Sequence, residues 1–514
     1  MKKLTLNNYS LIFLLVAIIS GILASADGRL HWDEPGYLYA GIYHNYNEII
    51  NADVEASGVN EFYSGRILHV LMIFVLQSVI NNSAMVFYVL SFTYFALILF
   101  CLLLSLNIIR ALMPSMKNAF LSITLLSMSP VIWYMAFKTL PDIPALAASV
   151  LATKSLVARS KGEGAYWNAL AILGMTVSAL TKPQGILMPA SFWVTGCIIQ
   201  NCAIDRRRLF LNGIFTGMAS MFVAYLILEI VGVGINRYIT SYIAAFYNPM
   251  PISAKILNIF SELGILWPFI LISLFSPRLN EKKFMWVWLI SSIAPLLILF
   301  EDPEARHLAV NLIAVGGLIS MSLETVDQKF GLYMKSSSSL KLLSKILGLL
   351  ILIISNYCII YIMPHEVDIR QLKSTIHAID DRYGKGNYTL LVPWFYTNFN
   401  IIRVLWPEID VRIIRREISS KNYHKEHYIT EIEELKKEKR IKIIMSYTNT
   451  FAAENLKKAM YYVSPQFTHR LFRKLGLVDH MHDDASNWLW MSNEMQFEYL
   501  FRIGHYLAYE AKFS

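Results

Sequence analysis

An adjacent pair of carboxylates, Asp33 and Glu34, lies in the segment H-W-D-E-P-G-Y-L-Y-A-G at 31–41, shortly after an apolar run near the N-terminus. A carboxylate in a water-poor site becomes a better general base, because loss of water raises its pKa. A simpler interpretation is that the pair caps a helix and interacts favourably with its dipole. Pro35 fits the first turn of such a helix. Three tyrosines follow and would add an aromatic rim: Tyr37, Tyr39 and Tyr43.

A third carboxylate, Asp142, follows Lys138 in the segment K-T-L-P-D-I-P, at the end of another apolar run. A charge at the centre of a bilayer costs roughly 2.5–3.5 kcal/mol on insertion scales, and less near the interface. A carboxylate in such a place usually has a partner or a function. Either Asp142 orients a substrate, or it forms an ion pair with Lys138 that has only a structural role at a helix end.

Two further segments carry cations at the ends of apolar runs. T-K-P-Q-G contains Lys182 and Gln184, and E-D-P-E-A-R-H contains Arg306 and His307. Singly, such a side chain usually extends its charge from the membrane to the interface. Together, the four segments put acidic and basic groups at four separate helix ends on one face of a membrane, where they could converge.

The elements that must position these groups are membrane helices. Of the 514 residues, 55% are hydrophobic and 16% are charged, which excludes most soluble globular proteins. Residues 365–514 hold 41 of the 83 charged residues, so a polar domain follows a membrane domain. The net charge of +9 does not indicate binding of nucleic acid, because basic residues orient membrane proteins.

Eleven apolar stretches could cross a bilayer, and we expect a polytopic α-helical membrane protein. The stretches lie near 9–26, 84–109, 119–137, 144–158, 166–181, 186–203, 209–232, 259–276, 284–300, 306–322 and 345–363. A twelfth, 67–80, is short. If it stays outside, the inner loops collect 16 Lys and Arg against 7 in the outer loops, as the positive-inside rule requires. We therefore expect 67–80 to be a helix at the outer surface of the inner (plasma) membrane, with a cytoplasmic N-terminus.

The predicted division is a membrane domain at 1–363, with its first outer loop at 27–83, and an extracytoplasmic domain at 364–514. In the second domain, strand-like segments at 389–394, 410–414 and 442–447 alternate with helix-like segments. This rhythm predicts a small α/β unit with a short parallel sheet. No glycine-rich phosphate loop follows these strands, so nucleotide binding has no support.

In their order along the chain, these segments resemble the GT-C superfamily of membrane glycosyltransferases. The nearest likeness is to the branch of the protein O-mannosyltransferases and the lipid A aminoarabinose transferase, which is similar to glycosyltransferase family 39. The resemblance covers about residues 1–325. It rests on the D-E segment after the first span, S-G-R-I-L-H at the surface helix, L-P-D-I-P after the third span, K-P-Q-G after the fifth and A-R-H-L late in the chain.

The resemblance implies a fold, an activity and roles for these residues. It implies transfer of a sugar from a polyprenyl-phosphate donor to an acceptor hydroxyl at the outer face, with inversion, in the cell envelope. Asp33, with Glu34 beside it, takes the place of the catalytic carboxylate, and Asp142 that of the acid in the second outer loop. Residues expected to bind substrate are Lys138, Lys182, Gln184, Arg306, His307, Arg66 and Tyr37. Relatives often have R-P-P-L where this chain has Arg66-Ile67-Leu68, and R-Y where it has Arg306-His307.

Such a transfer needs few groups. The phosphate leaves as a stable anion, so one base and some positive charge suffice, without the second acid of glycoside hydrolysis. No cofactor is required by the residues, although Asp33 and Asp142 could share a divalent metal ion. The four cysteines have no metal-ligand spacing and predict neither a disulfide nor a metal site.

Two other classes of function compete with this hypothesis. A transporter or flippase of a lipid-linked glycan intermediate would place charges within its spans and often shows internal repeats. Here Glu229 is the only acid well inside a predicted span, Glu262 lies near the end of another, and no repeat is visible. A structural or sensory protein anchored by its spans would not need eleven of them. The expected partners are therefore the lipid-linked donor, membrane lipids and an acceptor that is a lipid, a glycan or a protein.

Overall fold

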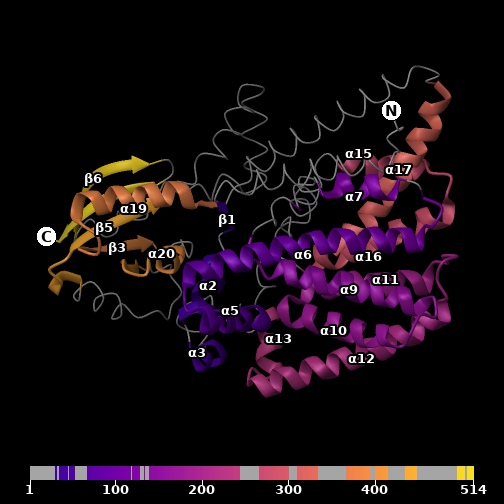
Figure 1. Cartoon of the computed structure of the whole chain (residues 1–514), viewed down its shortest axis with the longest axis horizontal. Helices are drawn as coiled ribbons and strands as arrows, with labels where there is room; N and C mark the ends of the chain where they lie inside the picture. Colours follow the sequence, from indigo (N-terminus) through magenta and orange to yellow (C-terminus); the bar gives the residue numbers. More distant parts are fainter. Residues whose placement is uncertain are drawn as a thin grey trace, which may run out of the picture. The chain divides into compact units, whose positions relative to one another are not determined.

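The computed structural model of the chain describes residues 29–31, 34–43, 45–51, 66–116, 118–127, 132, 138–243, 266–299, 310–333, 366–393, 400–414, 435–447, 495–503 and 506–513. The chain divides into two compact units (Figure 1). The helical unit comprises Met1–Ala26, His44–Asn81 and Met85–Ile360, and the α/β unit comprises Asp27–Tyr43, Asn82–Ala84 and Tyr361–Ser514.

The long helices of the helical unit follow the predicted spans. They are α6 (Ser83–Leu112), α9 (Asp142–Ser160), α10 (Tyr166–Thr181), α11 (Leu187–Ile198), α12 (Arg206–Val231), α16 (Leu279–Leu299) and α17 (Leu312–Tyr333). Shorter elements join them: α3 (Tyr46–Asn51), α5 (Ile67–Ile80), α7 (Ala119–Ser127), η1 (Pro183–Ile186), α13 (Ile235–Ile243), α15 (Trp267–Ile272) and η4 (Ser273–Phe275). Helix α9 packs on α10, and α12 packs on both, as Figure 1 shows.

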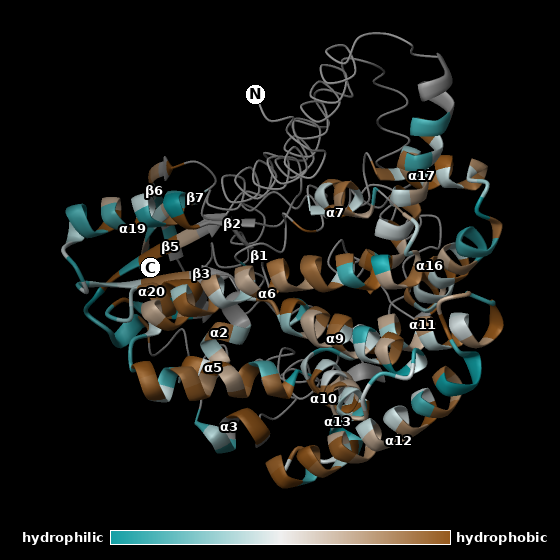
Figure 2. Cartoon of the chain, turned by 45° about the vertical axis from the view of Figure 1, so that its right-hand side comes forward, coloured by the Kyte–Doolittle hydropathy of each residue, from teal (hydrophilic) through white to brown (hydrophobic). Residues whose placement is uncertain are grey.

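The outer helices of this unit carry apolar side chains on exposed faces. In the described part of the chain, α6 and α12 are long and apolar enough to cross a membrane by length and composition. Phe215, Met218, Met221, Phe222 and Ile230 on α12 are all exposed, and Figure 2 shows the brown, hydrophobic colour along this helix. Such a face suits lipid rather than water. The count of eleven spans stays a prediction, and the stretches 9–26 and 345–363 lie outside the described residues.

Small residues let α9 and α10 pack closely. An added Cβ on Gly174 of α10 would lie 2.6 Å from the carbonyl oxygen of Ala148 and 3.1 Å from Cβ of Ala152, both on α9. The two helices also share a hydrogen bond between Ser149 and Ser178, at 2.9 Å between the hydroxyl oxygens. Small side chains and hydroxyl bonds are the usual means by which helices associate without a hydrophobic driving force.

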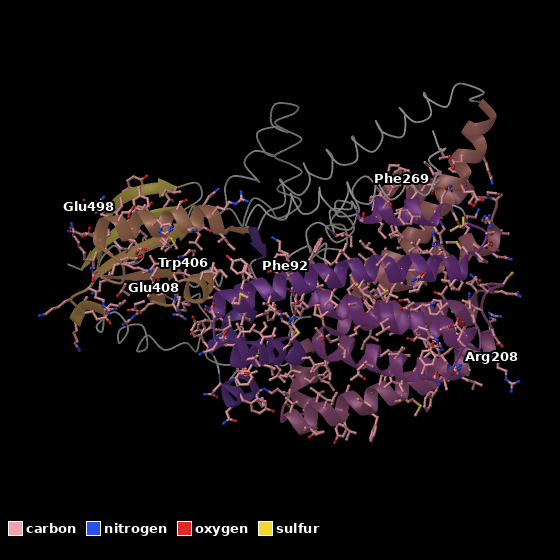
Figure 3. The ribbon with its side chains drawn as sticks, in the orientation of Figure 1. Phe92, Arg208, Phe269, Trp406, Glu408 and Glu498 are labelled. Atoms are coloured by element: carbon pink, nitrogen blue, oxygen red, sulfur yellow. The ribbon has the colours of Figure 1, made fainter. Side chains whose placement is uncertain are left out.

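The basic loops gather at one end of the helical unit. The Lys161 ammonium donates to the carbonyl of Ala111 at 2.7 Å, and Arg278 makes two bonds with the Glu324 carboxylate, at 2.8 and 2.9 Å. Arg208 lies at the start of α12, at this same end (Figure 3). Because α9 begins at Asp142 and ends at Ser160, Asp142 lies at the opposite end of the unit.

The α/β unit contains a five-stranded sheet in the order β4-β3-β5-β7-β6. The strands are β3 (Tyr388–Pro393), β4 (Asp410–Ile414), β5 (Ile441–Tyr447), β6 (Met495–Ile503) and β7 (Tyr506–Phe513). β3 pairs in parallel with both β4 and β5, as predicted from the βαβ rhythm. The antiparallel pair of β6 and β7 is an addition that the rhythm did not predict. Helix α19 (Ile369–Tyr383) packs on these last two strands, with Leu372, Ile376 and Ile379 buried along one face.

The beginning of the first loop, Asp27–Tyr43, belongs to the α/β unit. Strand β1 (Arg29–His31) pairs antiparallel with β2 (Glu366–Asp368), with Leu30 opposite Val367. Helix α2 (Glu34–Tyr43) packs on α20 (Asn400–Leu405). Strand pairing and helix packing thus join residues 29–31 and 34–43 to the C-terminal part of the chain. The predicted division of the chain at 363–364 stays a prediction. The extracytoplasmic location of this unit stays a prediction.

Candidate functional site

The carboxylate and the ammonium from two separate sequence motifs meet in a buried ion pair. The Lys182 Nζ contacts Oδ1 of Asp142, and the two side chains are 3% and 4% exposed. Asp142 begins α9, whereas Lys182 directly follows α10. The partner that the sequence suggested for Asp142 was Lys138; the structure instead shows an ion pair with Lys182. Two opposite charges in a low-dielectric place interact strongly, so removing either one takes away a strong stabilising interaction of the other.

A proline lies next to each residue of this ion pair and restricts the local backbone. Pro141 precedes α9, and the amides of Ile143 and Ala145 donate to the carbonyls of Leu140 and Pro141 at 3.3 and 3.2 Å. Asp142 thereby occupies the first helical turn, where a negative charge interacts favourably with the helix dipole. Lys182 precedes Pro183 and has the extended conformation that proline favours in the preceding residue.

Gly185 brings η1 against α9 and α10. An added Cβ would lie 2.1 Å from Oγ of Ser178 and 2.7 Å from Oγ of Ser149. The amide of Gly185 donates to the carbonyl of Lys182 at 2.9 Å. Any larger residue would displace these two hydroxyl groups, so Gly185 helps to place Lys182 beside Asp142. Lys182 and Gln184 of this motif are predicted site residues, whereas Gly185 is not among them.

A histidine that the sequence analysis did not select lies close to the ion pair. His69 on α5 is 1% exposed, and its Nδ1 is 2.8 Å from the hydroxyl of Tyr94 on α6. Burial lowers the pKa of His69 to about 3; the nearby charge of Asp142 opposes this shift, and the charges of Arg66 and Lys182 add to it. His69 is therefore neutral near pH 7. Its only signal in the sequence was its place in S-G-R-I-L-H.

The other predicted site residues have the following places. Lys138 and Gln184 are buried, at 4% and 8% exposure, and Gln184 lies in η1 between Lys182 and Gly185. Arg66 immediately precedes α5 and is half-buried. Helix α2 begins at Glu34, so Pro35 lies in its first turn, as predicted, and Tyr37 is buried. Asp33, Arg306 and His307 lie outside the described residues.

Among the described residues, no three His, Cys, Asp or Glu side chains form a group that could hold a metal ion. A divalent ion shared by Asp33 and Asp142, which the sequence analysis left open, would involve a residue outside the described part of the chain.

Comparisons with known proteins give structural relatives. No family model matches the chain, and no curated protein matches it. The crystal structure of ArnT from Cupriavidus metallidurans in the apo state has a TM-score of 0.59 and 10% sequence identity, over 98% of each chain. The same protein bound to undecaprenyl phosphate has a TM-score of 0.52, with the same identity and coverage. An oligosaccharyltransferase from Archaeoglobus fulgidus has a TM-score of 0.48 and 12% identity, over 98% of this chain and 74% of that one. ArnT is the lipid A aminoarabinose transferase, so the fold implied by the resemblance is confirmed.

The packing around Gly185 predicts that Gly185→Ala destabilises the protein. The new methyl group overlaps Ser178 and Ser149, so η1 must move away from α9, at a cost of about 1–3 kcal/mol. Thermal unfolding in detergent measures the change. Adding Ser178→Ala removes the nearest oxygen and should recover part of the loss. Gly217→Ala on α12, where nothing lies within 4 Å, is the control and should be neutral or slightly stabilising. Equal stability of the two alanine variants would contradict this account.

Burial of His69 predicts a loss of stability in acid. The unfolded chain takes up a proton below about pH 6.5, whereas folded His69 stays neutral until about pH 3. Unfolding therefore becomes easier as the pH falls through this window, by up to about 1.4 kcal/mol for each pH unit. We expect His69→Gln to flatten the dependence of the melting temperature on pH between 6.5 and 3. The same slope in both proteins would show that His69 titrates normally.

Proposed function

Because the chain has the GT-C fold, we propose that it is an integral membrane glycosyltransferase that uses a polyprenyl-phosphate sugar. The acceptor hydroxyl attacks the anomeric carbon at the outer face of the membrane, with inversion. The bond between that carbon and the phosphate oxygen breaks, and the polyprenyl phosphate leaves as an anion. Asp33 receives the proton of the acceptor hydroxyl as the new C–O bond forms.

The observation that carries the proposal is the meeting of Asp142 and Lys182. The two residues come from the L-P-D-I-P and K-P-Q-G segments, which were selected from the sequence as an acid and a cation of one site. An ion pair that only joined two helices would not need to occur in the two segments that carry the resemblance. The related ArnT structure contains undecaprenyl phosphate, which is a product of the kind of transfer proposed here.

The ion pair gives Lys182 a role in binding the leaving group. In the absence of an anionic ligand, Asp142 neutralises the ammonium, so that neither charge is left unpaired in the buried site. A phosphate that enters competes with the carboxylate for Lys182. The released Asp142 then accepts a hydrogen bond from a hydroxyl of the donor or the acceptor. Positive charge held near the phosphate stabilises the charge that develops on it in the transition state.

The remaining assignments follow the resemblance. Lys138, Gln184 and Arg306 bind the donor together with Lys182, and Arg66, His307 and Tyr37 complete the substrate-binding set. A divalent ion shared by Asp33 and Asp142 is compatible with the reaction but not required by it. The acceptor is a lipid, a glycan or a protein of the cell envelope.

Transfer assays with purified variants test the reaction. We expect Asp33→Asn and Asp142→Asn to lower the transfer of a radiolabelled sugar from a polyprenyl phosphate to membrane acceptors by at least about a hundredfold, because each removes a negative charge from the site. Asp381→Asn, which changes an exposed carboxylate on α19, is the control and should retain activity. Wild-type transfer rates in both site variants would eliminate the proposal, provided that circular dichroism shows normal folding.

Labelling of single cysteines tests the orientation. In a background without the native cysteines, Lys385→Cys lies in an exposed turn of the α/β unit and Arg207→Cys at the exposed start of α12. We expect a membrane-impermeant maleimide to label position 385 in intact cells and position 207 only after lysis. The positive-inside rule gives this result, because three arginines follow one another at 206–208. The reverse pattern would overturn the proposed outer location of the α/β unit.

A further inference from the structure

The described residues of the α/β unit show how helix α2 is attached to the rest of that unit. Helix α2 follows Asp33 directly and begins at Glu34. Its buried side chains Tyr37, Leu38 and Ala40 belong to the same unit as the fully buried Ile401, Ile402 and Val404 of α20. The two helices pack on each other. Apolar packing alone allows two short helices to slide, because it has no direction.

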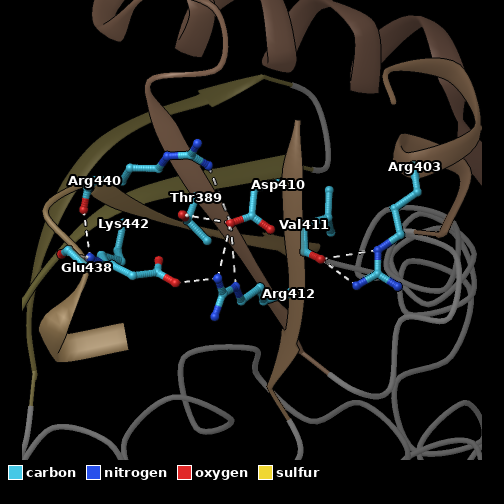
Figure 4. Close-up of polar contacts among 8 residues, drawn as sticks. All are labelled: Thr389, Arg403, Asp410, Val411, Arg412, Glu438, Arg440 and Lys442. Carbon is cyan, nitrogen blue, oxygen red and sulfur yellow. Dashed lines mark hydrogen bonds and ion pairs between the residues drawn. The ribbon is translucent and has the colours of Figure 1, made fainter. Parts of the chain in front are cut away.

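Directional contacts converge on a single side chain of α20, Arg403. The Cζ atom of Arg403 lies 5.1 Å from the centre of the Tyr39 ring on α2. Its Nε donates to the carbonyl of Val411 on β4 at 3.1 Å, and its Nη2 donates to the same oxygen. Figure 4 shows the guanidinium beside Val411. One side chain therefore links α2, α20 and the edge strand of the sheet.

The last carbonyls of α20 complete the attachment. Helix ends leave carbonyl groups without partners inside the helix. The hydroxyl of Tyr43 on α2 donates to the carbonyl of Arg403, and the hydroxyl of Ser83 donates to the carbonyl of Val404 at 2.7 Å. The Tyr39 and Tyr43 rings also contact each other, with 5.1 Å between their centres. Residues of the first loop thus satisfy the end of a helix located more than 300 residues later.

We propose that Arg403 is a positioning residue that fixes α2, and through α2 the Asp33–Glu34 pair, in the α/β unit. The catalytic part of this statement rests on the proposed function, whereas the attachment of α2 does not. Strand β1 ends at His31 and α2 begins at Glu34, so only two residues of the sequence, Trp32 and Asp33, separate these two attached elements. A general base must be held within hydrogen-bond reach of its substrate, so the attachment of both elements limits where the carboxylate can lie.

The chemistry of arginine is required for this link. A guanidinium can lie flat against an aromatic ring while its N–H groups donate in the plane, which an ammonium group cannot do. A cation over a ring gains about 0.5–2 kcal/mol, depending on exposure. Lysine at position 403 should therefore not replace arginine, whereas phenylalanine at position 39 keeps a ring for the cation.

Two measurements on the full-length protein test the proposal. Amide hydrogen exchange of residues 34–43 reports the attachment of α2, and the steady-state kinetics of sugar transfer from a polyprenyl-phosphate hexose reports the position of the carboxylates. We expect Arg403→Met and Arg403→Lys to speed up exchange in α2 at least tenfold and to lower kcat on the order of tenfold to hundredfold. The KM for the lipid donor should stay within about twofold.

Matched variants separate a positioning role from general damage. Arg440→Met removes an exposed arginine that pairs with Asp410 at 3.7 Å (Figure 4), and should change neither measurement. Tyr39→Phe should stay close to wild type in both, whereas Tyr39→Leu should behave like Arg403→Met. In the double variant Tyr39→Leu with Arg403→Met, kcat should fall no further than in either single variant, because both remove the same link. If Arg403→Met fails to fold, Tyr39→Leu carries the test.

The outcomes are distinguishable. Unchanged exchange of α2 in Arg403→Met would show that Arg403 does not fix the helix. Faster exchange with wild-type kcat would show that the attachment does not position a catalytic group. Absence of transfer by the wild-type protein would overturn the proposed function and the catalytic part of this proposal with it, while the exchange measurement still tests the attachment.

Discussion

A buried lysine and a buried aspartate stabilise each other's charge when the two side chains are in contact. Asp142 and Lys182 meet this condition, and the surrounding backbone is built to keep them together. Proline turns set the direction of the chain at both residues, and the α9–α10 crossing leaves no room for a side chain at Gly185. The ion pair would also respond to an anionic ligand, because an anion that binds Lys182 would release the carboxylate of Asp142.

Much of the helical unit could be predicted from the sequence, because lipid imposes a simple rule on helix length and composition. The ranges of α9 and α10 are close to the predicted spans at 144–158 and 166–181. The three parallel strands were also predictable, since buried strands between helical segments are apolar and short. Positions of charged residues at span ends pointed to Asp142 and Lys182, but the sequence suggested Lys138 as the partner, because four residues separate it from Asp142 along the chain.

The contacts that the sequence could not predict depend on residues that are distant along the chain. Nothing in R-L-H at 29–31 indicates a strand partner at 366–368, since three residues carry no periodicity. His69 was missed because a lone histidine in an apolar helix has no signature until its burial and its bond to Tyr94 are known. Gly185 likewise resembles an ordinary turn glycine, and only the hydroxyl groups around it explain why it cannot be larger.

The pairing of β1 with β2 limits how many times the chain can cross a bilayer between these strands. Two strands joined by hydrogen bonds occupy the same aqueous compartment, so a membrane topology that fits this pairing has an even number of crossings between His31 and Glu366. The same parity applies between Tyr43 and Ser83, whose hydroxyls both reach carbonyls of α20. Helix α5, with 14 residues and a length of about 21 Å, therefore cannot be a solitary passage between those two points.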